Sequence, residues 1–167
     1  MSGVSTVALA DRLAIADTLT LYSRGIDRCD LEILQAVFWP DATAKYGAVA
    51  QNAHAWAVAT VTALKGMERT FHSLSNMLIT VEGDHARAET YCTAWHWLTG
   101  PDGPTEMVVG GRYLDDLEKR DGEWRITRRL YVMDWNRNVP STAIWDAGIY
   151  AGLVNRGARK PDDPSYG

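Results

Sequence analysis

The chain has 167 residues, a formal net charge of −4 and two cysteines, and its aromatic residues comprise seven Trp, seven Tyr and two Phe. This length favours one domain with a substantial core, and the acidic balance excludes the basic surface that is typical of nucleic-acid binding. The two cysteines form no CxxC motif, no segment approaches the roughly 20 apolar residues of a membrane span, and no basic leader is present, so we expect a cytoplasmic protein.

The N-terminal region predicts two helices joined by a short turn. Apolar side chains recur at the helical period from Val7 to Ile26 and form one stripe. The members of this stripe are Ile15, Leu19, Tyr22 and Ile26. Asp30 is suited to cap a short second helix that extends through Phe38 and is stopped by Pro40.

A short strand and a third helix are expected next. Asp41–Tyr46 has the pattern of a strand, and the alanine-rich segment Asn52–Leu64 has that of a helix that ends near Gly66.

After Gly66 the apolar period changes to two, which predicts four long strands. They are Thr70–Val81, Ala86–Leu98, Glu106–Lys119 and Glu123–Trp135. Hairpin turns are expected at Gly83-Asp84, between Pro101 and Pro104, and at Asp121-Gly122. Helices followed by such a meander form an α+β pattern, in which the sheet curls round the helices.

The predicted architecture is a cone in which three N-terminal helices pack on a strongly curved sheet and enclose a pocket. Gly110-Gly111 provides a bend in mid-strand. Residues 1–154 are expected to form this single domain. Residues 155–167 are rich in Pro, Gly and charge, and we expect a loosely ordered tail there.

The register of the first hairpin decides whether His72 and His96 share a face of the sheet. A three-residue loop after Glu82 places His72 opposite His96 and Asn76 opposite Cys92, whereas a two-residue loop sends His96 to the other face. That other face collects large apolar side chains suited to an interface. They are Phe71, Met77, Tyr91, Trp95 and Trp97.

The last hairpin poses the same question of register. A three-residue loop with Gly122 in the left-handed position is preferred, and it places Tyr113 opposite Arg129.

Asp27 and His72 are the candidate catalytic pair. A carboxylate that orients an imidazole is the minimum equipment for moving a proton near neutral pH. Each residue also has a structural interpretation, Asp27 as a turn former and His72 as a hydrogen-bonded core residue. A metal site of Asp27, His72 and His96 is disfavoured because no close-spaced ligand motif supports it.

Several segments, taken in order, resemble the SnoaL-like family of the nuclear transport factor 2-like superfamily. They are Tyr22–Asp30, Val37–Ala42, His72–Asn76, Val81–Asp84, Val109–Tyr113 and Arg120–Arg129. The relatives that these segments resemble are scytalone dehydratase, lindane dehydrochlorinase and the bile-acid dehydratase.

The resemblance implies a cystatin-like cone, no cofactor, no metal and a trimeric or other homo-oligomeric assembly. It carries the catalytic dyad to Asp27 and His72. It also places polar or aromatic pocket positions at Tyr22, Tyr46, His96, Tyr113 and Arg129. Trp39 is a candidate apolar wall, and Asn76 joins the pocket set through the predicted register.

The predicted function is a cofactor-independent lyase of the dehydratase or dehydrohalogenase type. It would remove a proton from a small hydrophobic cyclic substrate, without nucleic-acid or membrane partners. Three alternatives stay open: an isomerase that uses the same dyad, a non-catalytic small subunit of a ring-hydroxylating dioxygenase, and a ligand-binding or polyketide-cyclase-like protein.

Overall fold

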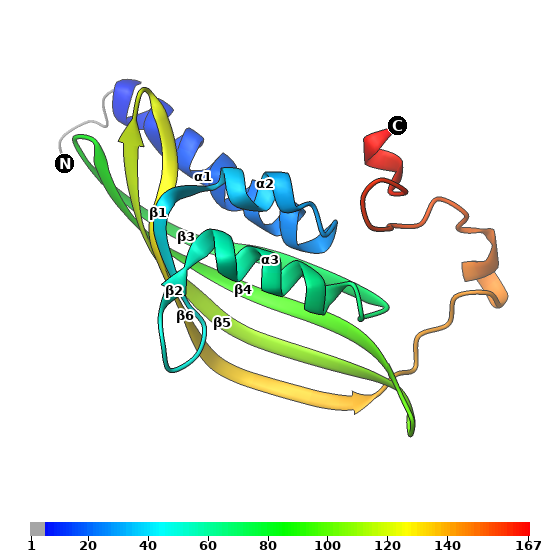
Figure 1. Cartoon of the computed structure of the whole chain (residues 1–167). Coiled ribbons are helices and arrows are strands. Elements are labelled where there is room, and N and C mark those ends of the chain that lie inside the picture. The colour runs from blue at the N-terminus through cyan, green and yellow to red at the C-terminus, as the bar shows by residue number, and fades with distance from the viewer. Residues whose placement is uncertain (1–5) are drawn as a thin grey trace.

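Three helices lie on one side of a single curved sheet, and together they form the predicted α+β cone (Figure 1). The structure is a computed structural model that describes residues 6–167. The helices are α1 (Thr6–Asp27), α2 (Leu31–Ala36) and α3 (Ala53–Leu64). The strands are β1 (Phe38–Lys45), β2 (Gln51–Asn52), β3 (Arg69–Glu82), β4 (His85–Gly100), β5 (Gly103–Arg120) and β6 (Glu123–Pro140).

The sheet is mixed, with the strand order β2-β1-β6-β5-β4-β3. Strands β3 to β6 form an antiparallel meander, whereas β1 lies parallel to β6. The predicted stripe of α1 packs against the sheet, and its four side chains are at most 2% exposed. This packing joins the N-terminal helix to the strands that carry the histidines.

Side-chain caps begin both short helices. The Asp30 carboxylate accepts from the backbone N–H groups of Glu32 and Ile33 at 3.1 and 3.3 Å, as predicted for α2. The Asn52 side chain does the same for α3. The expectation that the second helix reaches Phe38 is wrong, because α2 ends at Ala36 and Phe38 already pairs with β6 as the first residue of β1.

Both predicted three-residue loops are wrong, because both turns contain two residues. Glu82 pairs with His85 across Gly83-Asp84, and Arg120 pairs with Glu123 across Asp121-Gly122. Asp121 and Gly122 have φ angles of 53° and 87°, which suits the primed turns of tight hairpins.

Irregularities farther along each hairpin restore the face that the histidines share. The β3–β4 register shifts between Ser75 and Leu78, where Asn76 adopts a φ of 46°. His72 therefore pairs with Ala94, two residues from the predicted His96, and a shift of two keeps both histidines on one face. In the last hairpin, a shift between Asp116 and Leu117 likewise pairs Tyr113 with Tyr131 rather than with Arg129.

The predicted bend at Gly110-Gly111 coincides with another shift of register, between β5 and β6. A Cβ atom on Gly110 would stand 2.0 Å from the Trp135 indole, and one on Gly111 would stand 2.3 Å from the Val132 carbonyl oxygen. Only glycine allows β6 to approach β5 this closely, which permits the local curl of the sheet.

The sheet face away from the helices exposes several large apolar side chains. They include Phe71, Tyr91 and Trp135, each between 43% and 54% exposed. No helix within residues 6–167 is long and apolar enough to cross a membrane.

After β6, the chain leaves the sheet and returns to the end of α1 and α2 (Figure 1). This segment, residues 141–167, contains two short 3-10 turns, Gly148–Gly152 and Pro164–Tyr166. The loose order predicted for residues 155–167 stays an expectation about motion, but in the structure this tail makes specific contacts.

Candidate active site

Asp27 and His72 meet at the junction of α1 and β3. The Asp27 Oδ1 atom lies 2.7 Å from His72 Nδ1, and Asp27 Oδ2 accepts from the His72 backbone N–H at 2.8 Å. Both side chains are largely buried, with 9% and 8% of their surface exposed. Two bonds to the same histidine fix the carboxylate both in rotation and in position.

The surroundings of Asp27 favour its ionised form. Burial by itself raises the pKa of Asp27, but the hydrogen bonds and charge of His72 outweigh it, so the pKa is lowered overall. Asp27 is also the last residue of α1, where the helix dipole disfavours an anion. A partner that can carry positive charge therefore stabilises the carboxylate.

The His72 ring also lines a cavity of about 240 Å³ between the helices and the sheet. Because Nδ1 is engaged by Asp27, Nε2 is the ring nitrogen left to face the cavity. The other lining residues are mostly apolar or aromatic. They are Tyr22, Ile26, Tyr46, Trp56, Thr60, Leu64, Cys92, Ala94, His96, Val109, Tyr113 and Tyr131.

One wall of the cavity consists of phenol groups. The Tyr22 and Tyr46 hydroxyls are 2.5 Å apart, and the Tyr113 ring stands edge-on to Tyr22 with centroids 5.3 Å apart. Burial raises the pKa of Tyr22, Tyr46 and Tyr113, and it raises the pKa of Tyr131 to about 12. The phenols therefore stay protonated near neutral pH and can donate hydrogen bonds.

A buried ion pair lies behind this wall. Arg129 donates from Nε and Nη2 to the two oxygens of Asp115, both at 2.7 Å, and neither side chain is exposed. The guanidinium lies 3.9 Å from the Tyr22 ring centroid and 4.1 Å from that of Tyr113. Burial would lower the pKa of Arg129, but Asp115 outweighs this effect and the cation is retained. Its Nη1 atom makes no well-formed hydrogen bond.

His96 stands beside His72 in the cavity, with ring centroids 5.5 Å apart and planes at 84°. Burial, followed by the neighbouring His72, lowers the pKa of His96 to about 4. The ring is therefore neutral near pH 7. Its Nδ1 atom is buried without a well-formed hydrogen bond.

Four of the predicted pocket residues line the cavity: Tyr22, Tyr46, His96 and Tyr113. Arg129 lies behind the phenol wall and is not a lining residue, and two other predicted residues lie away from the cavity. Asn76 occupies the irregularity in β3 and is exposed, because the shift of register turns it away from the Cys92 side. Trp39 donates from its indole nitrogen to the Glu118 carbonyl oxygen at 3.1 Å and lies against two arginines outside the lining.

Three contributions were missed by the sequence analysis. Trp56 of α3 stacks on Tyr46 at 4.4 Å, and Tyr131 stacks on the same ring at 5.4 Å. Asp115, the partner of Arg129, was missed although a signal was available. It stands between the buried residues Tyr113 and Leu117, at the inward position of a period-two pattern.

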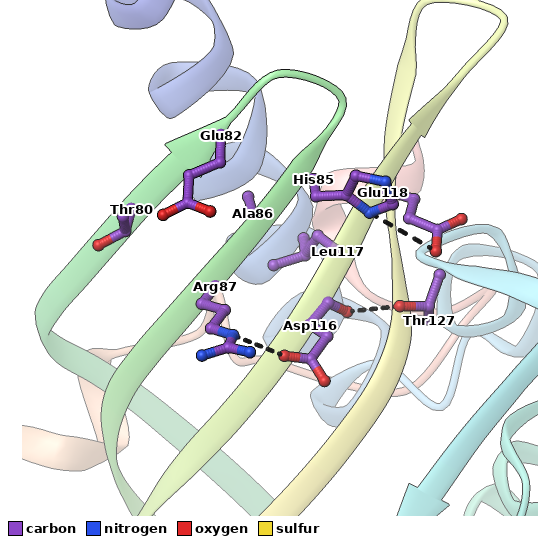
Figure 2. Close-up of a pocket in the computed structure, with 9 residues that line it drawn as sticks. All are labelled: Thr80, Glu82, His85, Ala86, Arg87, Asp116, Leu117, Glu118 and Thr127. Carbon is purple, nitrogen blue, oxygen red and sulfur yellow. Dashed lines mark hydrogen bonds and ion pairs between the residues drawn. The ribbon is translucent and has the colours of Figure 1, made fainter.

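Figure 2 shows the residues that line a second hollow, near the turn between β3 and β4. The volume of this hollow is about 440 Å³. Four of its side chains form two ion-pair contacts. Arg87 lies 3.6 Å from Asp116, and His85 lies 3.8 Å from Glu118. This hollow does not include the dyad. No group of three or more His, Cys, Asp or Glu side chains placed to hold a metal occurs in the described part of the chain.

Comparison with known proteins gives one family match and many similar folds. A family model described as a SnoaL-like domain matches residues 7–130. A hexachlorocyclohexane dehydrochlorinase (LinA type 2) superposes with a TM-score of 0.72 at 20% identity, covering 81% of this chain and 93% of its own. A provisionally named scytalone dehydratase from Novosphingobium aromaticivorans gives 0.70 at 24% identity, with 81% and 91% covered. At these identities both structures show a shared fold.

Two further structures extend the comparison. A provisionally named aromatic ring hydroxylase from N. aromaticivorans is 28% identical, with a TM-score of 0.68 and coverage of 78% of this chain and 94% of its own. A Nostoc punctiforme protein described as having a cystatin-like fold gives 0.61 at 20% identity, with 78% and 94% covered. The cystatin-like fold predicted from the sequence is thereby confirmed.

Proposed function

The chain belongs to the SnoaL-like domain family, and we propose that it is a cofactor-independent lyase of the dehydratase or dehydrohalogenase type. The observation that carries the proposal is the 2.7 Å contact between Asp27 and His72 Nδ1, made by a histidine that also lines an aromatic cavity. A histidine with a purely structural role is usually enclosed by the core, whereas the His72 ring lines a cavity.

In the proposed reaction, His72 is the general base. Its Nε2 lone pair accepts a proton from a substrate carbon while the C–H electron pair forms the new C=C bond. The leaving group departs from the adjacent carbon with its own bonding pair. Asp27 keeps the neutral imidazole protonated on Nδ1 and stabilises the imidazolium that forms, as expected for an orienting carboxylate.

Tyr22 and Tyr46 are the proposed donors to the oxygen or leaving group on which negative charge develops. Their phenols are protonated, and the Arg129 cation behind the Tyr22 ring favours negative charge at this wall. Neutral His96 provides a further polar contact at the base side of the cavity.

The cavity also limits the proposed substrate. A volume of about 240 Å³ bounded by Tyr46, Trp56, Tyr113 and Tyr131 suits a compact cyclic molecule with few polar groups. The similarity in fold to LinA and to the provisionally named scytalone dehydratase supports a search among halogenated and hydroxylated rings.

A test follows the substrate proton directly. A panel of hydroxylated and halogenated cyclic compounds is incubated with the enzyme in D2O, and products are identified by mass spectrometry and NMR. Loss of water or HX by the wild type, abolished in His72→Ala, supports the lyase. Deuterium gained without elimination identifies an isomerase instead. Tight co-purification with a larger chain and no reaction with any compound would favour the dioxygenase-subunit alternative.

We also propose a homo-oligomer, because the sheet face away from the helices exposes Phe71, Tyr91 and Trp135. Exposed apolar clusters of this kind mark contact surfaces. Light scattering of the purified chain gives the assembled mass directly. A single protomer at all concentrations would contradict this assembly.

A further inference from the structure

The C-terminal segment is anchored at the turn between α1 and α2. The Asp163 carboxylate accepts from Arg28 at 2.6 Å and from the Ala158 backbone N–H at 2.9 Å. The Tyr166 hydroxyl donates to Asp30 at 2.8 Å, and Asp30 also caps α2. These bonds place residues 158–166 directly behind the end of α1.

Arg159 extends from this anchor into the junction of three elements. Its Nη1 atom donates to the Asp27 carbonyl oxygen at 2.5 Å and to the Thr70 hydroxyl at 2.8 Å, and Nη2 donates to the Leu64 carbonyl oxygen at 3.2 Å. Asp27 and Leu64 are the last residues of α1 and α3. Carbonyl groups at helix C-termini lack intrahelical partners and carry partial negative charge, which a cation stabilises.

The Thr70 hydroxyl connects Arg159 to the dyad. This side chain is 5% exposed, and its oxygen accepts from the guanidinium. A hydroxyl has a single proton, so the proton of Thr70 is left to point elsewhere. The nearby Thr70 hydroxyl also contributes to the lowered pKa of the Asp27 carboxylate, after the larger effects of burial and His72.

We infer that Arg159 is a positioning residue for the Asp27–His72 dyad, so that the C-terminal segment forms part of the active site. Arg159 acts on both ends of Asp27: it binds the main-chain carbonyl directly, and it orients the Thr70 hydroxyl toward the carboxylate. It also supplies positive charge at a helix end that would otherwise disfavour the Asp27 anion. The inference rests on the proposed function for its catalytic meaning, although the contacts themselves do not.

The first experiment needs no substrate. In full-length protein, nitrogen-15 NMR reports which ring nitrogen of neutral His72 carries the proton, with the signals assigned by their loss in His72→Gln. The wild type is expected to hold the proton on Nδ1. Arg159→Ala is expected to increase the Nε2–H form and to speed solvent exchange of the Nδ1 proton about tenfold, because the Asp27 end of α1 opens more often.

Arg156→Ala is the matched control. Arg156 is another arginine of the same segment, and within residues 6–167 its side-chain bonds go only to Trp145, Asp146, Tyr150 and Leu153. This variant is expected to keep the wild-type tautomer and exchange rate. If Arg159→Ala behaves like Arg156→Ala, the inference is overturned.

Thr70 provides a second pair of variants, which also serves if Arg159→Ala does not fold. Thr70→Val keeps the shape of the side chain but removes the hydroxyl, and it is expected to alter the His72 tautomer. Thr70→Ser keeps the hydroxyl and is expected to restore the wild-type signal. An unaltered tautomer in a folded Thr70→Val protein contradicts the role of Thr70 and leaves Arg159 without its route to the carboxylate.

Activity then separates this inference from the proposed function. With a turned-over substrate, Arg159→Ala should lower kcat about 10²-fold with little change in KM, as expected for a misplaced base. An altered tautomer without any substrate turnover in the wild type would contradict the lyase but not the positioning role. A normal tautomer together with normal kcat would contradict the positioning role alone.

Discussion

Two buried carboxylates near the cavity each pair with a basic side chain, and these partners give them different roles. Asp27 pairs with His72, whose ring lines the cavity and can gain or lose a proton. Asp115 pairs with Arg129 through two bonds of 2.7 Å, entirely out of contact with solvent. The first pair can exchange a proton with a ligand, whereas the second holds a permanent charge behind the phenol wall. The comparison predicts that one pair governs turnover and the other governs stability.

The largest expected effect is on turnover, at the Asp27–His72 pair. His72→Ala and Asp27→Asn should each lower kcat about 10²–10⁴-fold, because one removes the general base and the other no longer selects its tautomer. Circular dichroism and chemical denaturation should show a folded protein in both cases. Near-normal turnover in either variant would contradict the catalytic role of the dyad.

The next largest effect is on stability, at the Asp115–Arg129 pair. Asp115→Asn should lower the free energy of unfolding by about 3–5 kcal/mol, because it leaves the Arg129 charge buried without its counter-ion. The double variant Asp115→Leu with Arg129→Met should recover most of this loss, since it removes both charges together. Denaturant titration measures both. An Asp115→Asn protein as stable as the wild type would remove the contrast between the two pairs.

The pH dependence of stability tests the neutral ring beside the dyad. The folded pKa of His96 is lowered to about 4, below the reference value near 6.5 for the unfolded chain. Its contribution is therefore fully present above pH 6.5 and is lost as the pH falls from 6.5 through about 4. At about 1.4 kcal/mol per unit, the loss amounts to about 3 kcal/mol.

His96→Gln should remove this component of the pH dependence, as measured by denaturant titrations between pH 7 and pH 4. His85→Gln is the control, because the His85 side chain is 75% exposed. Equal slopes for His96→Gln and the wild type would show that His96 is not held neutral by the fold.

The smallest expected effect is at the phenol wall. Tyr46→Phe should lower kcat by about 10²-fold or less, since it removes one donor to the developing charge and leaves its partner Tyr22 in place. Tyr91→Phe, on the exposed face of the sheet, should leave kcat unchanged. Steady-state kinetics on the same substrate compares the two variants.

The Asp27–His72 pair could be predicted from the sequence, whereas the Asp115–Arg129 pair could be predicted only in part. Asp27 and His72 stand at the end of a clear helical stripe and in a strand of clear period, so their elements were predictable. Arg129 was assigned to the pocket by resemblance, but Asp115 was overlooked. A charged residue at an inward position is costly to bury, and only the facing guanidinium makes its burial favourable.

The strand registers show why local signals were insufficient. Each hairpin turn is one residue shorter than predicted, yet each pair of strands shifts again at an irregularity. The shorter turn and the irregularity each shift the strand register by one residue. The total shift of two residues keeps the side chains beyond the irregularity on their predicted face of the sheet. Asn76 lies at such an irregularity, so its predicted position in the pocket is wrong. His96 lines the cavity as predicted, although its strand partner differs from the predicted one. The contribution of the C-terminal segment was missed for another reason, because its contacts at the end of α1 are with residues more than a hundred positions earlier.

The complete burial of Arg129 and Asp115 also affects how the protein responds to salt and heat. Dissolved ions screen charges that they can approach, and neither member of this pair meets solvent. The electrostatic influence of Arg129 on the phenols should therefore persist at ionic strengths that weaken surface ion pairs. The free-energy cost of having withdrawn the two charges from water decreases on warming. Residues around this pair should accordingly keep their native packing at temperatures where more exposed parts of the sheet begin to loosen.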